Sequence, residues 1–216
     1  MKERWRALIT ELAPSVPGDW EIRGSGWRTS LVRQPEPWTI AWIGFTKSAY
    51  SDEGWFHAGV APLVTHHFNW GSPFTVRTDR VEGFPKAIDL TNPGVGEVLR
   101  EFAVGPAIEK IERGLSSVLA SGAEKNYARA QRPRRPPHYW LMVPGWRVVL
   151  GTDSPEAPAA EAVEFYTELG DTEAITFYQT LLDTWKADGR EGTLTFLEAD
   201  RVRKIRAGGL RGMKIV

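Results

Sequence analysis

Residues 39–64 of the 216-residue chain read TIAWIGFTKSAYSDEGWFHAGVAPLV. Val, Ile, Phe, Trp and Thr, which favour strands, are concentrated at both ends of this stretch. The SAYSDEG segment between them is rich in small and acidic residues, which allow a chain to reverse its direction. The stretch therefore predicts two strands joined by a hairpin turn. This is the signal of a folded core and not of a catalytic site.

Further strand-like segments lie on both sides of this hairpin. No helical pattern separates them, and consecutive strands joined only by loops form an antiparallel meander with one face available to a core. We therefore predict an α+β fold with an antiparallel meander sheet of about four to five strands packed on helices. The predicted strands are Trp27–Gln34, Thr39–Lys47, Trp55–Leu63 and Phe74–Val81, with a short edge at Lys86–Leu90.

Helical spacing occurs before and after the sheet. Near the N-terminus, apolar residues recur at i, i+3, i+4 and i+7 and form one stripe of a short helix that Pro14 ends. These residues are Trp5, Leu8, Ile9 and Leu12. From Val95 to Leu119 the same spacing predicts two helices lying across the sheet, split at Gly105 and Pro106.

The C-terminal part is predicted to be helical and to contain a helical hairpin. Its helical segments are Ala159–Leu169, Thr172–Ala187 and Thr193–Arg206. Gly170 suits the end of one helix and Asp171 the start of the next, so an antiparallel pair joined there is the simplest arrangement. Residues 139–150 (YWLMVPGWRVVL) are ambiguous, and we interpret them as two short strands around a turn or as a buried extended segment.

We expect three parts along the chain. Residues 1–122 form the α+β sheet domain, and residues 139–216 form a helical extension packed on it. Between them, residues 123–138 gather arginine and proline and lose hydrophobic periodicity. This composition predicts a linker with polyproline character.

Composition excludes several classes of protein. The chain has no cysteine, which rules out disulfides, thiolate nucleophiles and cysteine-based metal sites. Its 27 basic residues equal its 27 acidic residues, so the whole molecule has no global attraction to nucleic acid or to an anionic membrane. The N-terminus lacks the apolar core of a signal peptide, and no segment is apolar over the length of a membrane span. We therefore expect a cytoplasmic protein.

Tryptophan is unusually frequent and unevenly distributed. Seven of the ten tryptophans lie at or before Trp70. We interpret them as residues of the core beneath the sheet. The alternative is an exposed aromatic patch for a ligand or a partner.

Motifs for catalysis are missing. The chain has no phosphate-binding loop, no nucleophile elbow and no HExxH zinc motif, so we predict no catalytic residue and no cofactor. Gly24-Ser25-Gly26 is a fragment of a dinucleotide loop that precedes a strand, and we interpret it as a turn.

One candidate metal site remains, because two histidines and a carboxylate can hold a divalent ion. Its ligands would be Asp52, His57, His66 and His67.

The alternative for these histidines is structural. His57 then alternates with core residues along its strand, while His66 and His67 point to opposite sides of an extended segment.

Arginines gather in the predicted linker. Together with the aromatic residues that follow, they have the composition of a site that binds a phosphate backbone and stacks a base. Proline interrupts the segment and the whole chain is neutral, so we interpret it mainly as a solvated linker. The arginines of this candidate nucleic-acid site are Arg129, Arg132, Arg134 and Arg135.

An acidic block lies between Arg147 and Lys186, where eight acids occur without any lysine or arginine. One interpretation is internal compensation by the basic residues before and after it. The other is an acidic helical face that steers a basic protein partner. The residues of that predicted partner-binding face are Glu161, Glu164, Glu168, Asp171 and Glu173.

The order of these elements resembles a known family. The N-terminal amphipathic helix, the strand ending in Phe45-Thr46-Lys47-Ser48 and the strand Trp55-Phe56-His57-Ala58-Gly59-Val60 are similar to the uncharacterised bacterial family catalogued as domain of unknown function 4304. The helices joined by Leu169-Gly170-Asp171 are similar to a tail often seen there. Thr46 departs from the glutamine more usual in the family, and the Arg/Pro segment is longer. The resemblance covers roughly residues 1–120 and implies a fold, since the family has no established activity.

We therefore predict a non-enzymatic protein-interaction module, in the form of an immunity-type inhibitor of a bacterial toxin, because some small proteins of this kind accompany secreted toxins. Its partner would be a basic protein and not a membrane. The alternative is a metal-dependent hydrolase or other enzyme that uses the region of His57, His66 and His67. Binding of nucleic acid through Arg129–Arg135 ranks third.

Overall fold

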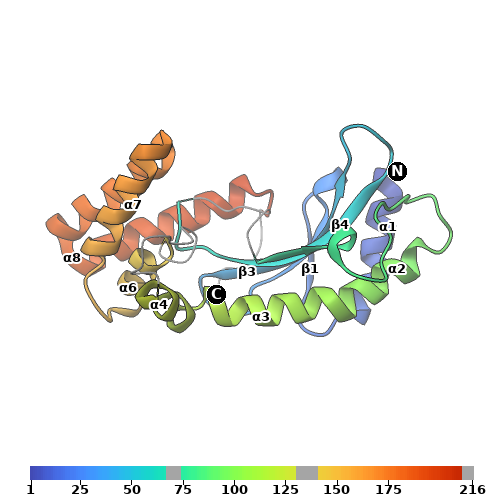
Figure 1. Cartoon of the computed structure of the whole chain (residues 1–216), viewed down its shortest axis with the longest axis horizontal. Coiled ribbons are helices and arrows are strands. Elements are labelled where there is room, and N and C mark those ends of the chain that lie inside the picture. The colour runs from blue at the N-terminus through green and yellow to red at the C-terminus, as the bar shows by residue number, and fades with distance from the viewer. Residues whose placement is uncertain (67–73, 130–140, 211–216) are drawn as a thin grey trace. The chain divides into compact units, whose positions relative to one another are not determined.

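The fold is that of a computed structural model, and the structure describes residues 1–66, 74–129 and 141–210. The chain forms two compact units. The sheet unit contains Met1–Ala61, Trp70–Leu115 and the residues from Arg206 onward, and the helical unit contains Pro62–Asn69 and Ser116–Ile205. Helices and an antiparallel sheet occupy separate stretches of the chain, which confirms the predicted α+β class (Figure 1).

The strands of the described residues form one five-stranded antiparallel sheet in the order β1-β2-β3-β4-β5. Because neighbours in the sheet are also neighbours in sequence, the sheet is a meander, as predicted. Its register places Leu31 opposite Ile43 and His57 opposite Arg77. The strands are β1 (Glu21–Arg23), β2 (Ser30–Arg33), β3 (Thr39–Lys47), β4 (Gly54–Pro62) and β5 (Thr75–Arg77).

The two longest strands, β3 and β4, come from the stretch rich in β-branched and aromatic residues. Their hairpin closes where the Ser48 backbone N–H donates to the Glu53 carbonyl at 2.8 Å. All residues of β3 from Thr39 to Phe45 are buried, and Phe56 of β4 is completely buried. The hairpin is therefore the centre of the core of the sheet unit, as its composition predicts.

Helix α1 (Lys2–Leu12) packs on one face of this hairpin. The Trp5 ring lies 5.4 Å from that of Phe45 and 5.9 Å from that of Phe56. The Trp5 indole N–H donates to the Thr29 carbonyl at 2.8 Å, which satisfies the polar edge of this buried ring. Pro14 lies just beyond α1, in the short helix η1 (Ala13–Ser15). The predicted stripe is confirmed, since the buried residues of α1 are Trp5, Leu8, Ile9 and Leu12.

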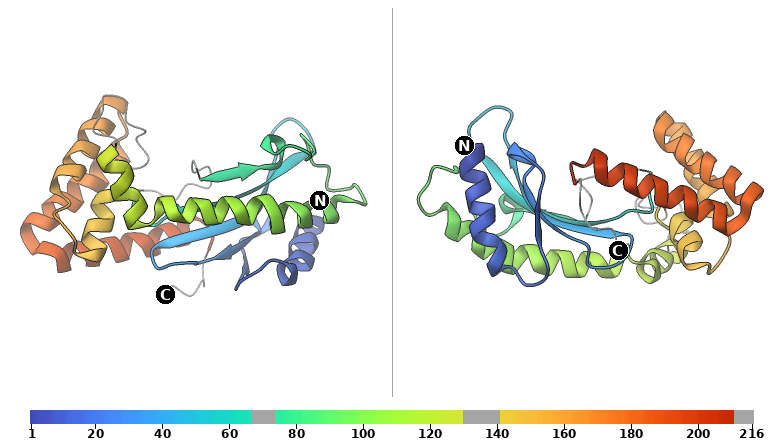
Figure 2. Two further views of the ribbon diagram at one scale, coloured as in Figure 1. Left: turned by 60° about the horizontal axis from the view of Figure 1, so that its bottom comes forward. Right: turned by 180° about the vertical axis from the view of Figure 1, so that it is seen from behind.

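Two further helices belong to this part of the chain and are separated at Gly105 and Pro106. Helices α2 (Val95–Phe102) and α3 (Ile108–Val118) are joined by one π-helical turn, η4 (Ala103–Ala107). Pro106 lacks the N–H that a regular α-helical turn requires, so the hydrogen-bond pattern widens here. The predicted split is confirmed, and Figure 2 shows α3 running along the sheet.

The fifth strand is not the one that the sequence suggests. It is β1, which pairs with β2 from Glu21 opposite Val32 to Arg23 opposite Ser30. The predicted edge at residues 86–90 contributes a single bridge, between Ile88 and Gly54. A strand of three residues is too short to show the alternation of apolar and polar residues by which a strand is predicted. β1 is therefore recognised by its pairing with β2 and not from its sequence.

The outer strands are shorter than predicted. Of the segment Trp27–Gln34 only β2 is extended, because a 3-10 turn, η2 (Gly26–Arg28), occupies its start. Of Phe74–Val81 only β5 is extended, because the turn η3 (Thr78–Arg80) follows it. Residues that favour strands continue into these turns, so the composition does not show where the strands begin and end.

The helical unit contains α4 (Ala120–Arg129), α6 (Val143–Leu150), α7 (Glu156–Leu169) and most of α8 (Thr172–Ala207). Helix α4 lies where the sequence suggested the start of an irregular linker. Its ASGAEKNYAR sequence includes several good helix formers, and Ala123 is buried. The rest of that segment, residues 130–138, lies outside the described residues. The predicted domain limits stay predictions.

Both interpretations of residues 139–150 are wrong for the described part, because residues 143–150 form α6. Pro144 occupies the first turn of the helix, where its missing N–H has no helical partner to lose. Gly151 ends the helix in the left-handed conformation (φ 65°), and its N–H donates to the Arg147 carbonyl at 2.8 Å. Most of α6 is buried, so the segment has no polar face that would reveal a helical period.

Helices α7 and α8 form the predicted hairpin. Gly170 ends α7 in the left-handed conformation (φ 70°), and the Asp171 carboxylate accepts a hydrogen bond from the Ala174 N–H at 3.0 Å. Helix α8 is broken at Gly189, whose φ of 63° and ψ of −154° only glycine adopts readily. The last two predicted helices are thus the two halves of α8. Neither α8 nor any other described helix has the length and apolar character of a membrane span.

Candidate functional site

The acidic residues singled out by the sequence lie on α7 and at the start of α8. The Ser154 hydroxyl fixes the beginning of α7, since it accepts from the Glu156 N–H at 3.2 Å and donates to the Glu156 carboxylate at 3.0 Å. The buried side of α7 consists of Pro158, Ala159, Ala162 and Tyr166. Glu161, Glu164 and Glu168 recur at i, i+3 and i+7 and therefore share the other side of the helix.

Three of the five predicted partner-binding acids have partners within the helical unit. Glu161 accepts a hydrogen bond from the Tyr127 hydroxyl at 3.3 Å. Asp171 caps the start of α8, and Glu173 lies 3.6 Å from the Arg203 guanidinium. These acids stabilise the packing of α4, α7 and α8, whatever else they do.

The other two acids, Glu164 and Glu168, are exposed and lie one turn apart. Within the residues that the structure describes, no lysine or arginine lies within ion-pairing distance of either carboxylate. Two apolar side chains border them, the partly exposed Phe165 and Leu169, which is 63 % exposed. We call Glu161, Glu164 and Glu168, with the bordering Phe165 and Leu169, the acidic face of α7.

Basic residues neutralise only the ends of the acidic block in the described part of the chain. Arg147 lies 3.3 Å from Asp153 at its beginning, and Arg203 lies close to Glu173 beyond α7. Glu164 and Glu168 receive no such partner from the described residues. Internal compensation within the described residues therefore accounts for part of the block and leaves these two carboxylates negatively charged.

The histidine proposed as the centre of a metal site, His57, lies half-buried on β4 of the sheet unit. Its Nδ1 accepts a hydrogen bond from the Trp42 indole N–H at 3.3 Å. Burial and, secondarily, the positive charge of Arg77 lower the pKa of His57 to about 4, although a hydrogen bond to the Phe45 backbone opposes the shift. The ring is therefore uncharged at neutral pH and oriented by its neighbours.

The other candidate ligands are not brought to His57. Asp52 lies in the β3–β4 turn, where its carboxylate is 3.2 Å from the Lys47 ammonium and 88 % exposed. His66 is buried in the helical unit with its ring 4.8 Å from that of Tyr166, and His67 lies outside the described residues. In the described ranges no three acidic or histidine side chains gather where they could hold a metal ion.

The sequence did not single out the most buried charged pair of the helical unit. Lys204 is 3 % exposed and pairs with Asp200, which is 6 % exposed. The Lys204 ammonium also donates to the Leu63 carbonyl at 3.0 Å and to the Thr65 carbonyl. The sequence shows the i, i+4 spacing of Asp200 and Lys204. The same spacing is common for ion pairs on exposed helical surfaces, so it does not indicate that this pair is buried.

These contacts give Lys204 a structural role. Its two carbonyl acceptors hold residues 63–65 against the second half of α8, and its ammonium lies 5.0 Å from the centre of the Phe177 ring. With so little exposed surface, the amine has no access to a substrate. The pair therefore belongs to the framework that supports α7 and α8.

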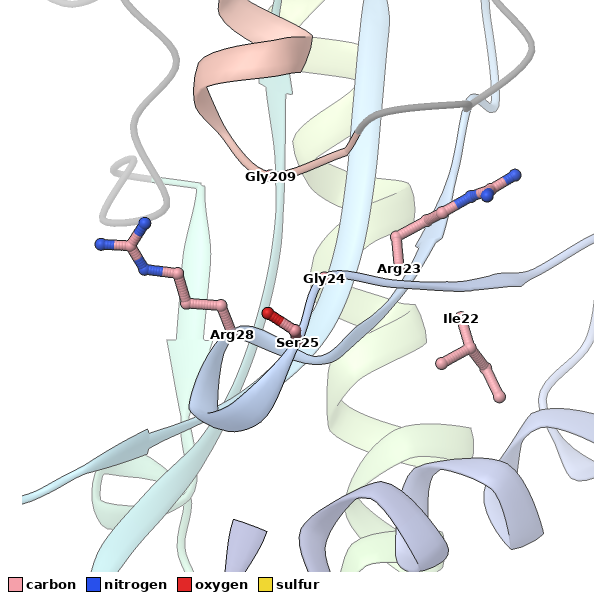
Figure 3. Close-up of a pocket in the computed structure, with 6 residues that line it drawn as sticks. All are labelled: Ile22, Arg23, Gly24, Ser25, Arg28 and Gly209. Carbon is pink, nitrogen blue, oxygen red and sulfur yellow. The ribbon is translucent and has the colours of Figure 1, made fainter. Parts of the chain in front are cut away.

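An open pocket of about 400 Å³ lies in the sheet unit, beside the predicted turn at Gly24-Ser25-Gly26. Gly24 (φ 82°) and Gly26 (φ 57°) have positive φ, which confirms the turn. Figure 3 shows the guanidinium groups of Arg23 and Arg28 pointing away from each other on opposite sides of the pocket, and Arg23 is also bound to Glu21. The two cations therefore do not converge on one anion.

The candidate nucleic-acid site falls largely outside the described residues. Arg129 is the last residue of α4, and the positions of Arg132, Arg134 and Arg135 are not described. Binding of nucleic acid through these arginines therefore stays a prediction.

Comparison with other proteins adds no further indication of function. No family model, no curated protein and no solved structure matches this chain.

Proposed function

We propose that this protein is a non-enzymatic protein-interaction module that binds a basic protein partner through the acidic face of α7. The supporting observation is that Glu164 and Glu168 are exposed and lack a cationic neighbour among the described residues, directly beside the exposed Leu169. In protein interfaces, a few buried anchor side chains supply most of the binding energy, whereas charges set the rate of approach and the choice of partner. The acidic face contains both kinds of group.

The stability of the fold gives no comparable reason for these residues. Exposed carboxylates contribute little to stability even when they are paired, and adjacent like charges one turn apart are mildly destabilising. Leu169 likewise buries little of its surface. Recognition of a partner with the opposite charge explains the combination more directly than folding does.

An immunity-type inhibitor of a bacterial toxin is the specific form that we propose. A toxin that acts on nucleic acid needs a basic surface, and an acidic face can cover such a surface. The inhibitor would act by occupying the surface of the toxin and would need no catalytic residue of its own.

The experiment is affinity capture from extracts of the source cells with two matched variants. Glu164→Lys with Glu168→Lys reverses the charge of the acidic face. Glu101→Lys with Glu112→Lys makes the same change at exposed positions on α2 and α3 of the sheet unit. We expect the wild-type protein and the sheet-unit variant to capture one basic protein that the acidic-face variant loses.

Salt provides an independent check on the same capture. Charge-steered association weakens as the Debye length falls from about 10 Å at 0.1 M salt to about 3 Å at 1 M. Capture by the wild-type protein should therefore decline over this range. Equal capture by both variants, or capture that salt does not change, would contradict the proposal.

A further inference from the structure

A pocket of about 370 Å³ lies between α4 and α6 in the helical unit. Ala120, Trp146 and Leu150 give it an apolar lining, and the carboxylates of Glu124 and Asp153 lie beside them. Leu150 is apolar, yet 52 % of its surface is exposed. The described residues therefore leave an apolar hollow with a partly acidic rim uncovered.

The walls of this pocket are held in place by hydrogen bonds, of which the one made by Trp146 is buried. The Trp146 indole N–H donates to the Val118 carbonyl at 2.8 Å, which sets the orientation of the ring. Arg190 caps the end of α6, since it donates to the Val148 carbonyl at 2.9 Å and to the Val149 carbonyl at 2.7 Å. A preformed pocket costs little ordering when a ligand enters it.

One guanidinium group serves both carboxylates of the rim. Arg147, whose side chain is 13 % exposed, lies 2.8 Å from Glu124 and 3.3 Å from Asp153. Among the residues that line the pocket, two negative charges against one positive charge leave a net negative charge. The rim therefore favours an apolar group carried by a cation over the same group carried by an anion.

The same arginine connects the pocket to the acidic face of α7. Its guanidinium lies 5.6 Å from the centre of the Tyr127 ring, and the Tyr127 hydroxyl donates to Glu161 at 3.3 Å. The pocket and the acidic face are thus linked through α4 and α6 within one unit.

We propose that this pocket receives an apolar side chain, leucine, methionine or phenylalanine, that lies next to a lysine or arginine of the basic partner. This inference rests on the proposed function and adds the buried anchor of the interface. An apolar anchor inside a ring of charges gives binding energy, and the negative rim discriminates against acidic segments.

The pocket can be tested without the partner by means of three capped tripeptides. Acetyl-Lys-Phe-Lys-amide has both the apolar and the cationic groups, acetyl-Glu-Phe-Glu-amide reverses the charge, and acetyl-Lys-Gly-Lys-amide lacks the apolar side chain. The readout is the indole N–H signal of Trp146 in ¹⁵N-labelled full-length protein, assigned with a Trp146→Phe variant. We expect only Lys-Phe-Lys to shift this signal with a Kd on the order of 1 mM.

Two blocking variants test the position of binding. Ser121→Trp and Thr152→Trp place a large side chain at exposed residues that line the pocket, and Thr176→Trp places one at an exposed residue of α8 that does not. The first two should weaken binding of Lys-Phe-Lys at least roughly tenfold, and Thr176→Trp should not. Thermal unfolding shows whether each variant is folded, and either blocking variant is sufficient.

The outcomes separate this inference from the proposed function. The proposed role of the pocket would be contradicted by any of three results. These are an unmoved Trp146 signal, equal binding of the Glu-Phe-Glu peptide, and unchanged binding of Lys-Phe-Lys to both folded blocking variants. Glu164→Lys with Glu168→Lys lies outside the pocket and should leave peptide binding intact while partner capture is lost. Capture that depends on the acidic face but survives both blocking variants would refute the pocket alone.

Discussion

At the scale of single residues, Lys204 shows how burial changes the chemistry of a charged group. Its ammonium is surrounded by Asp200, the carbonyls of residues 63 and 65 and the Phe177 ring. Burial lowers the pKa of Lys204 from 10.5 to about 8, although Asp200 opposes the shift. The fold therefore depends on pH in the alkaline range.

The direction of this dependence follows from the protons that each state holds. Between pH 8 and 10.5 the native protein has released the Lys204 proton while the unfolded chain still holds it, so the contribution of Lys204 to the free energy of unfolding rises with pH, by about 3 kcal/mol in total. Above pH 10 the trend reverses. Burial raises the pKa of Tyr166 and Tyr178, so the unfolded chain loses phenolic protons that the native protein keeps.

Urea unfolding between pH 7 and 11 measures this profile. We expect a maximum of stability near pH 10 in the wild-type protein. Lys204→Met removes the titrating amine, so this variant should lack the rise above pH 8 but keep the decline above pH 10. The same profile in both proteins between pH 8 and 10 would show that Lys204 is not the group responsible.

At the scale of secondary-structure elements, the sequence predicts best where residue type and packing agree. The limits of β3, Thr39–Lys47, are those predicted, because a run rich in β-formers is also buried from Thr39 to Phe45. Gly170 and Asp171 likewise predict the α7–α8 junction through local capping chemistry.

Prediction fails where packing determines the structure. Helix α6 is buried on most sides, so its residues show no helical period, and β1 exists only because β2 pairs with it. For the candidate site, the sequence locates the acids but cannot show that Asp171 and Glu173 have local partners while Glu164 and Glu168 do not. Burial of the Lys204–Asp200 pair depends on the carbonyl groups of Leu63 and Thr65, which are far away in sequence, and could not be predicted.

Gly145 on α6 gives a test at this scale. A β-carbon at Gly145 would collide with the Val64 backbone and side chain, whereas one at Gly105 in η4 meets no atom within 4 Å. Overpacking of a fixed backbone is destabilising, so Gly145→Ala should lower the free energy of unfolding by about 2 kcal/mol. Gly105→Ala should leave it unchanged or raise it by up to about 1 kcal/mol.

Chemical denaturation of the two alanine variants provides the comparison. Equal effects of the two substitutions would mean that α6 does not approach residues 62–66 as closely as described.

At the scale of the whole molecule, a net charge of zero conceals a local excess of negative charge. Equal numbers of acidic and basic residues exclude a global field, yet Glu164 and Glu168 on α7 have no cationic neighbour among the described residues. Such a local field acts over about one Debye length, roughly 8 Å at physiological salt. Recognition should therefore depend on the acidic face and not on total charge.

Site-specific photo-cross-linking in the source cells tests the central claim most directly. A benzoylphenylalanine residue replaces Glu168 on α7 or, as the control, the exposed Glu101 on α2. We expect position 168 to cross-link to one basic protein and position 101 not to cross-link to it. A lack of any cross-linked protein at position 168, or the same product from both positions, would contradict the assignment of α7 as the partner-binding surface.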